Sequence, residues 1–154
     1  MADYKGLFEM PEAFLRKLWP NLNPTNYELK SDYTSEYNCV AWALGINTDP
    51  IDLSLDEEGE PLLYPDLTCL VYIEHFEKEG FVLCDSPDWE ENYEKIVLYE
   101  RGGETFEHVA RQLEQNLWTS KLGEWEDIEH TTLEALKYDG YYGVPTWYMK
   151  RLKK

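Results

Sequence analysis

The first half of the chain shows apolar residues at helical spacing. Residues 7–22 carry an apolar stripe at i, i+1, i+4 and i+5, which predicts a helix that ends at Pro20. Residues 65–78 carry a second amphipathic pattern, with Asp66 in the first turn and Gly80 just past the end, and predict another helix. The apolar side chains expected to face the core from this second helix are Leu67, Leu70, Val71, Ile73 and Phe76.

A third, shorter helix is predicted over residues 37–45. Asn38 is a good N-cap, Gly45 suits the position after the last turn, and the residues between them are apolar. A short extended piece is expected before it, at residues 27–29, and an acidic, turn-prone surface loop after it, at residues 46–65. The acidic positions of this loop do not follow the spacing of an EF-hand, so the sequence does not predict a calcium site there.

From Phe81 onward the pattern changes to short runs typical of β-strands. Turn residues separate the runs, and tight connections at residues 101–104 and 114–116 indicate antiparallel neighbours. The predicted strands are Phe81–Cys84, Lys95–Tyr99, Glu107–Leu113 and Leu117–Leu122.

The end of the chain is expected to contain a loop, a short helix and an edge strand. Residues 124–130 are predicted as loop, and Thr131 and Glu134 as a capping box for the helix that follows. The last extended run, residues 143–149, is expected at a sheet edge because Pro145 has no N–H for a ladder hydrogen bond.

The order of these elements predicts an α+β fold. Helices come first and strands later, so we expect N-terminal helices packed on a C-terminal antiparallel sheet. A length of 154 residues fits one domain spanning 1–154. With 43% hydrophobic and 15% aromatic residues, the chain is too apolar to be disordered.

The net charge limits the expected partners, and the spacing of the cysteines limits the expected disulfides and metal sites. With 31 acidic and 14 basic residues, the formal net charge is −17, a field that repels nucleic acid and anionic membranes. Neither a membrane-spanning run nor a signal-peptide pattern is present, which predicts a cytoplasmic protein. Cys39, Cys69 and Cys84 have the spacing of neither a metal motif nor a disulfide framework, so we expect reduced thiols and no metal or cofactor.

Cys39, at the first position of the predicted short helix, is the candidate nucleophile. A thiol at that position meets unpaired backbone N–H groups and the positive end of the helix dipole, and both favour the thiolate. The same N–H groups, together with Asn38, could stabilise an oxyanion. The alternative is that Cys39 is a small buried hydrophobic residue.

His108 is the candidate base because no other histidine lies inside a predicted strand. Strand alternation places His108 and Gln112 on one face, and the hairpin pairs that face with Trp118 and Ser120. Ser120 would then lie opposite or diagonal to His108 and could accept its ring N–H, with Gln112 in a supporting position.

Asp127 and His130 form a rival set, in which the carboxylate orients one of the two histidines. The alternative is that both residues only hold their loop to the sheet through local hydrogen bonds. Cys39, His108 and His130 are conceivable zinc ligands, but no short-spaced pair anchors such a site.

The order of these residues resembles the papain-like cysteine hydrolases. A helix-borne cysteine in residues 37–45 is followed by a strand histidine in residues 108–113 and by a polar residue on the next strand. The compact bacterial cell-wall peptidases are the nearest in shape, and residues 118–130 also resemble a small bacterial family of uncharacterised proteins. The resemblance implies a papain-like arrangement with Cys39 as nucleophile, His108 as base and Ser120 where these enzymes carry Asn, Asp, His or Glu.

Two functions therefore stay open. One is a thiol hydrolase or amidase, in which His108 takes the proton of Cys39 and a thioester forms with an acyl or peptide-like substrate. The other is a non-catalytic binding or regulatory module, such as an immunity or antitoxin-like protein, whose acidity complements a basic protein partner. Catalysis requires a low-pKa thiol near His108, whereas a binding module tolerates the loss of Cys39.

Overall fold

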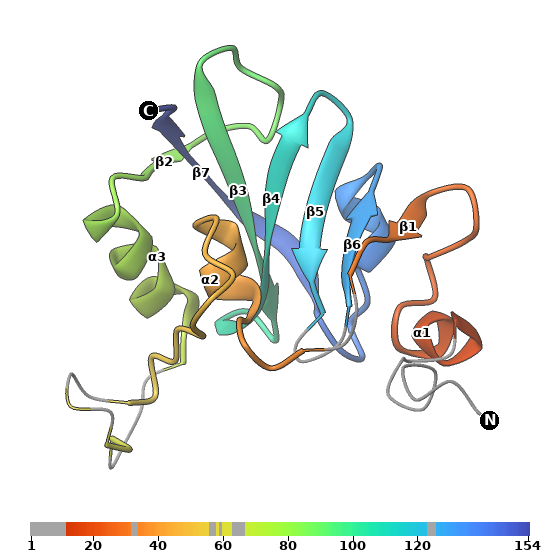
Figure 1. The fold of residues 1–154 in the computed structure, drawn as a ribbon, viewed down its shortest axis with the longest axis horizontal. Helices are drawn as coiled ribbons and strands as arrows, with labels where there is room; N and C mark the ends of the chain where they lie inside the picture. The colour runs from red at the N-terminus through yellow and green to blue at the C-terminus, as the bar shows by residue number, and fades with distance from the viewer. Residues whose placement is uncertain (1–11, 32–33, 56–57, 59, 63–66, 123–125) are drawn as a thin grey trace.

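One sheet of seven antiparallel strands forms the centre of the computed structural model (Figure 1). The structure describes residues 12–154 apart from 32–33, 56–57, 59, 63–66 and 123–125, and every statement below concerns these residues. The strand order is β1-β6-β5-β4-β3-β7-β2. The strands are β1 (Tyr27–Leu29), β2 (Val82–Cys84), β3 (Tyr93–Arg101), β4 (Thr105–Glu114), β5 (Leu117–Lys121), β6 (Asp127–His130) and β7 (Val144–Leu152).

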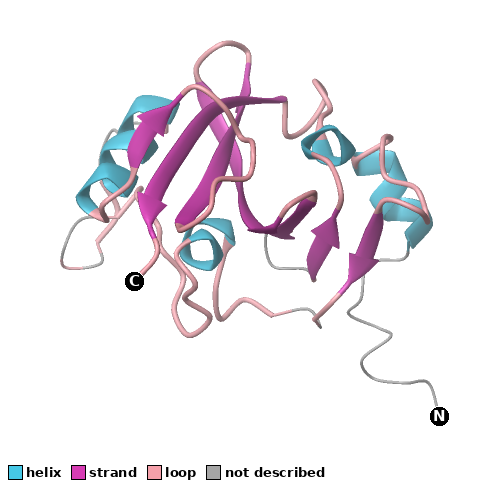
Figure 2. Ribbon diagram, turned by 90° about the horizontal axis from the view of Figure 1, so that it is seen from above, coloured by secondary structure: helices cyan, strands magenta, loops and turns pink. Residues whose placement is uncertain are grey.

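Short helices lie at separate places around this sheet (Figure 2). They are α1 (Glu12–Leu18), α2 (Cys39–Ala43), α3 (Cys69–Lys78) and the 3-10 helix η2 (Leu133–Leu136). None of the described helices is long and apolar enough to cross a membrane.

The sheet separates two apolar cores, because successive side chains of a strand point to opposite faces. The core on the face covered by α2 and α3 includes Ile96, Leu98, Val109 and Met149. The core on the face covered by α1 and η2 includes Val97, Tyr99, Ala110 and Trp118. Because β3 is central, all five residues from Lys95 to Tyr99 are buried.

Elements with strong local signals form as predicted. Asn38 caps α2 by accepting a hydrogen bond from the backbone N–H of Ala41. Tyr27–Leu29 forms β1, and the four predicted runs form β2 to β5. In the loop between β4 and β5, Asn116 has a positive φ of 61°, a conformation that asparagine tolerates well.

The predicted α+β fold, with N-terminal helices packed on a C-terminal sheet in a papain-like arrangement, is wrong. The first helices do not form a layer, because α1 belongs to one core and α2 to the other. The N-terminal part of the chain also supplies β1, which pairs with β6 at one end of the sheet. The molecule is mainly one large antiparallel sheet with a few short helices.

The C-terminal elements also differ from the prediction. Residues 127–130 are not a loop but strand β6, which pairs with both β5 and β1. β7 is not an edge strand, because it lies between β3 and β2. Pro145 is nevertheless accommodated, since β2 pairs only with residues 148–150 and leaves that side of Pro145 unpaired. Thr131 does not begin a capping box, because the N-cap of η2 is Thr132, which makes no side-chain capping bond.

The predicted buried face of α3 is also wrong in part. Leu67 and Leu70 were expected in the core but are 43% and 65% exposed. Cys69, Tyr72, Ile73 and Phe76 are the buried residues of the helix. The helix begins only at Cys69, where the backbone N–H of Cys69 bonds the carbonyl of Glu104, so contact with the β3–β4 hairpin fixes its rotation.

Candidate functional site

The side-chain amide of Asn38 is engaged in hydrogen bonds to the nearby backbone. Its Oδ1 accepts hydrogen bonds from the backbone N–H groups of Ala41, at 3.0 Å, and of Ile51, at 3.3 Å. Its Nδ2 donates to the carbonyl of Ile51 at 2.7 Å. Asn38 therefore fastens α2 to the following loop, and its amide is not directed at a substrate oxyanion.

Cys39 begins α2 as predicted and packs against β4. Burial raises the pKa of the Cys39 thiol to about 11, although the backbone N–H groups of Val109 and Val40 lower it in part. The N-terminus of this five-residue helix therefore stabilises the thiolate by less than the loss of solvation costs it. At neutral pH the thiol is protonated and is not an activated nucleophile.

His108 lies on the opposite face of β4 from Val109 and from the Cys39 thiol. Its fully buried ring stacks on that of Tyr142, with 4.4 Å between ring centroids and 8° between planes. Neither ring nitrogen has a hydrogen-bond partner among the described residues. Burial, followed by the nearby His130, lowers the pKa of His108 well below its ordinary value, so the imidazole is neutral. The structure therefore does not bring Cys39 and His108 together.

Ser120 lies on the predicted face but has a different partner. The register Arg111↔Thr119 and Gln112↔Trp118 matches the expected hairpin pairing. The Oγ of Ser120 lies 2.8 Å from the Nε2 of His130, and the Nδ1–H of His130 donates to the carbonyl of Thr132 at 2.8 Å.

The Ser120–His130 pair is a buried structural contact. Since the Nδ1 of His130 carries the proton, its Nε2 accepts from the Ser120 hydroxyl. Burial lowers the pKa of His130 to about 4. Both side chains are fully buried, so no substrate reaches them. The sequence does not indicate this pair, because its pattern predicts residues 127–130 as loop rather than as strand β6.

Asp127 holds the segment before α2 to the sheet. Its carboxylate accepts a hydrogen bond from the Tyr37 hydroxyl at 2.9 Å, and its backbone N–H donates to the Ser31 hydroxyl at 2.9 Å. Beside it, the Nζ of Lys121 donates to the carbonyl of Thr34 at 2.8 Å. Asp127 therefore has a structural role. Neither histidine is among the partners found for its carboxylate.

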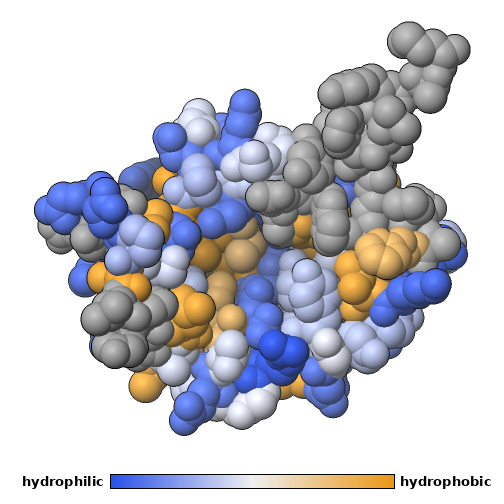
Figure 3. Space-filling view, turned by 90° about the horizontal axis from the view of Figure 1, so that it is seen from below, coloured by the Kyte–Doolittle hydropathy of each residue, from blue (hydrophilic) through white to orange (hydrophobic). Residues whose placement is uncertain are grey.

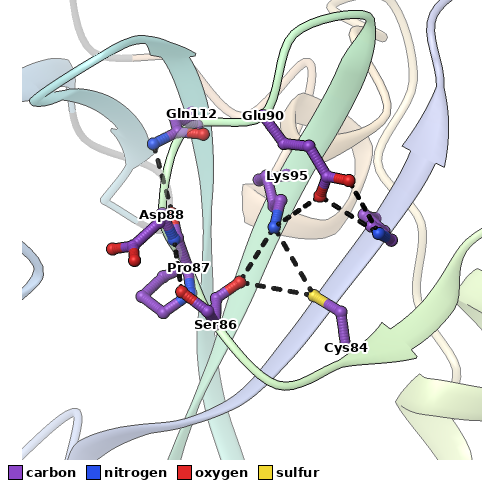
Figure 4. Close-up of polar contacts among 8 residues, drawn as sticks. Cys84, Ser86, Pro87, Asp88, Glu90, Lys95 and Gln112 are labelled. Atoms are coloured by element: carbon purple, nitrogen blue, oxygen red, sulfur yellow. Dashed lines mark hydrogen bonds and ion pairs between the residues drawn. The ribbon is translucent and has the colours of Figure 1, made fainter.

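Gln112 lines a polar hollow of about 470 Å³ together with two tryptophans, Trp89 and Trp118. Its Nε2 donates to the carbonyl of Pro87 at 3.3 Å (Figure 4). The rest of the lining is mainly amide and hydroxyl side chains. Gln112 shares a face of β4 with His108, but its contact is with the loop before β3.

A second hollow, of about 380 Å³, lies between the start of α3, the β3–β4 hairpin and β7. We call it the Glu100 hollow, and its lining residues are Thr68, Cys69, Leu70, Glu100, Gly103, Glu104 and Trp147. The Oε1 of Glu100 accepts a hydrogen bond from the indole N–H of Trp147 at 3.2 Å. Burial, followed by the charge of Glu100, raises the pKa of the Cys69 thiol to about 12.

Residues of the Glu100 hollow were not among the sequence candidates. Glu100 lies beyond the predicted run Lys95–Tyr99, and Trp147 comes from a strand far along the chain. Only the pairing of β3 with β7 brings the two together. The one feature of the sequence that pointed to this hollow is a glutamate directly after a buried strand.

No group of three or more His, Cys, Asp or Glu side chains that could hold a metal ion occurs in the described residues. Cys39 and His108, two of the three conceivable zinc ligands, lie on opposite faces of the sheet. All three cysteines are free thiols.

The sequence model of one protein family, described as a domain of unknown function (DUF7689), matches residues 28–150. The matched region runs from β1 into β7 and includes α2, α3 and the Glu100 hollow. No curated protein and no solved structure matches the chain.

Proposed function

The chain belongs to the DUF7689 family, a domain of unknown function, and we propose that it is a non-catalytic binding module for a basic protein partner. The Glu100 hollow carries the proposal, because it places two carboxylates and an indole around a cavity wide enough for one long side chain. The net charge of −17 attracts a basic partner from a distance and speeds its association.

The chemistry of the Glu100 hollow fits an arginine side chain of the partner. Glu100 is part-buried and held by Trp147, whereas Glu104 is exposed at the rim. A guanidinium binds carboxylates through paired N–H donors and packs well on aromatic rings. Leu70, 65% exposed beside the cavity, can cover the aliphatic part of such a side chain.

On the face drawn in Figure 3, the apolar surface of the described residues occurs as separate patches bounded by hydrophilic side chains. Figure 3 shows this distribution on one face, where orange patches alternate with blue ones. Such a surface suits recognition of single side chains in an extended segment better than a large permanent interface, which is more continuously apolar.

The geometry around Cys39 favours binding over thiol hydrolysis. A protonated thiol on one face and a neutral, unpartnered His108 on the other do not form a nucleophile–base pair. The resemblance to papain-like hydrolases stays a prediction. We infer that the binding takes place in the cytoplasm. The partner is a basic protein segment rather than nucleic acid or an anionic membrane, because the negative field of the protein repels the latter two.

The proposal is tested with a decapeptide of alternating arginine and alanine, titrated into labelled protein and followed by NMR. We expect the indole N–H resonance of Trp147 to shift, because a guanidinium at Glu100 competes for its hydrogen-bond acceptor. The double variant Glu100→Gln, Glu104→Gln should weaken binding at least about fivefold, since each of the two carboxylates contributes a fraction of a kcal/mol or more.

The matched control is Glu91→Gln, Glu114→Gln, which removes the same charge from exposed positions outside the hollow. It should weaken binding less than about twofold. Equal losses in the two double variants, or no shift at Trp147, would contradict the proposed site. A decapeptide of alternating glutamine and alanine should not bind.

A further inference from the structure

We propose that the molecule has a second binding site, which takes a neutral saccharide. The site is the polar hollow of about 470 Å³ beside Gln112, which we call the Trp118 hollow. Its volume lies within the range of about 300 to 1,000 Å³ that is usual for small-molecule sites. The loop between β2 and β3, the β4–β5 hairpin and the chain after β6 enclose it. Its lining residues are 87–89, 112, 115–116, 118 and 131–133.

Trp118 presents an unpaired donor to this hollow. Its side chain belongs to the core on the face covered by α1 and η2 and is only 4% exposed. Its indole N–H has no hydrogen-bond partner among the described residues and is not wholly enclosed by them. Because the polar groups of a largely buried side chain are nearly always paired, this N–H indicates an acceptor on a ligand.

Gln112 adds an unpaired acceptor next to this donor. It is the cross-strand neighbour of Trp118 in the β4–β5 pair. Its Nε2 donates to the carbonyl of Pro87 at 3.3 Å, which fixes the amide group (Figure 4). Its buried Oε1 has no partner in the described part of the chain. A hydroxyl group both donates and accepts hydrogen bonds, so a ligand rich in hydroxyls matches these two neighbouring side chains.

The rim of the hollow is formed by exposed polar side chains. None of them makes a hydrogen bond or an ion pair through its side chain within the described residues, and Thr132 makes no such bond even though it is the N-cap of η2. These side chains supply carboxylate, amide and hydroxyl groups to a ligand, the set that suits a polyhydroxylated molecule. The residues are Asp88, Gln115, Asn116, Thr131 and Thr132.

The backbone beneath this rim is held in place. The backbone N–H of Thr131 donates to the carbonyl of Asn26 at 3.0 Å, and the carbonyl of Thr132 accepts from the Nδ1 of His130 at 2.8 Å. On the opposite wall, the ammonium group of Lys153 lies 4.6 Å from the ring centroid of Trp89. The walls are therefore ordered before a ligand binds, which lowers the entropic cost of binding.

The charge of the lining selects against anions. Asp88 is the one charged residue among the described residues that line the hollow. In Figure 4 its carboxylate points away from Lys95. With a net charge of −17 on the whole chain, a ligand that carries phosphate or carboxylate is repelled. A lone carboxylate instead accepts charge-assisted hydrogen bonds from hydroxyl groups, so the lining favours a neutral saccharide.

The Trp118 hollow does not depend on the arginine site proposed above. Trp118 belongs to the core on one face of the sheet, whereas Trp147 of the Glu100 hollow packs against the core on the other face. The indole N–H resonances of these two tryptophans therefore report on the two sites separately. Failure of one proposal leaves the other unaffected.

The test titrates the labelled full chain with cellobiose, maltose, lactose and N,N′-diacetylchitobiose, each up to about 20 mM, and follows the indole N–H resonances by NMR. We expect at least one disaccharide to bind with a Kd of about 1 mM or lower. It should shift the resonance of Trp118 and leave that of Trp147 unchanged, because only Trp118 lines this hollow.

Asp88→Ala should weaken binding of that disaccharide at least about fivefold, because it removes the charged acceptor. The matched control is Asp85→Ala, which removes an exposed carboxylate from the same loop but outside the hollow. It should change the affinity less than about twofold. Both positions are exposed, so both variants should fold like the wild type.

Three results would overturn the proposal. The first is that no disaccharide shifts the Trp118 resonance, or that each shifts Trp147 equally. The second is an equal loss of affinity in Asp88→Ala and Asp85→Ala. The third is that adenosine, a neutral aromatic ligand, binds the Trp118 hollow more tightly than every disaccharide, which would assign the hollow to an aromatic base instead of a saccharide.

Discussion

Replacing Gly143 by alanine is expected to cost about 4 kcal/mol or more of stability. Gly143 has a φ of +76° directly before β7, and a Cβ there would lie 2.0 Å from the carbonyl oxygen of Glu100. It would also lie 2.8 Å from the Cα of Arg101, so only movement of the β3 backbone could relieve the contact. Hydrogen bonds in both directions between Gly143 and Tyr138 hold Gly143 in place.

The matched control is Gly102→Ala, at a φ of +65° with no atom within 4 Å of the added Cβ. This variant should lower the free energy of unfolding only by the cost of holding alanine at a positive φ, about 1 to 2 kcal/mol. Urea denaturation followed by tryptophan fluorescence measures both variants. If Gly143→Ala loses no more stability than Gly102→Ala, the close approach of β7 to β3 at this position is wrong.

Acidification from pH 7 to pH 4 is expected to remove stability through the two buried histidines. Burial lowers the pKa of His130 to about 4 and that of His108 well below its ordinary value. The unfolded chain binds these protons near pH 6.5, so the contribution is complete above that pH and is lost as the pH falls toward the folded-state pKa. For His130 alone, the interval from about 6.5 to about 4 corresponds to about 3 kcal/mol.

His108→Phe isolates this effect from the titration of the many carboxylates. The ring of His108 packs against the rings of both Tyr99 and Tyr142, and its unpartnered nitrogens make phenylalanine an acceptable replacement. At pH 7 the variant should be as stable as the wild type, or more stable by about 1 kcal/mol. Between pH 7 and pH 5 it should lose less stability than the wild type. Equal losses in urea denaturation at the two pH values would show that His108 is not buried in the neutral form.

The parts of the fold that depend on local chemistry could be predicted from the sequence. Asn38 and Gly45 bound α2 through capping preferences, and the two hairpins follow from short turn segments. Strand β6 could not be recognised, because four residues carry little periodicity until β5 and β1 pair with them. The sequence predicts β7 at an edge because Pro145 lacks an N–H, but β2, which lies more than 60 residues earlier in the chain, pairs with residues 148–150 and not with Pro145.

The candidate site depended on which face of the sheet α2 covers, and strand alternation cannot predict this. Alternation correctly placed His108 and Ser120 on one face of the β4–β5 pair, but it does not say which face α2 covers. α2 covers the Val109 face, which separates Cys39 from His108. One further feature could be read from the sequence: a lysine such as Lys95, beside the apolar residues of a central strand, needs buried hydrogen-bond partners, and its Nζ donates to the carbonyl of Ser86.

The most direct test compares two variants in calorimetric titrations with the arginine–alanine decapeptide. Cys39→Ala, His108→Phe removes both residues of the hypothetical catalytic pair, whereas Glu100→Gln, Glu104→Gln alters only the Glu100 hollow. We expect the first to bind the peptide with wild-type affinity and the second to bind at least about fivefold more weakly, with the peptide recovered intact from every sample. Peptide cleavage that only the Cys39→Ala, His108→Phe variant abolishes, or loss of binding in that variant alone, would contradict a binding module and support a thiol hydrolase.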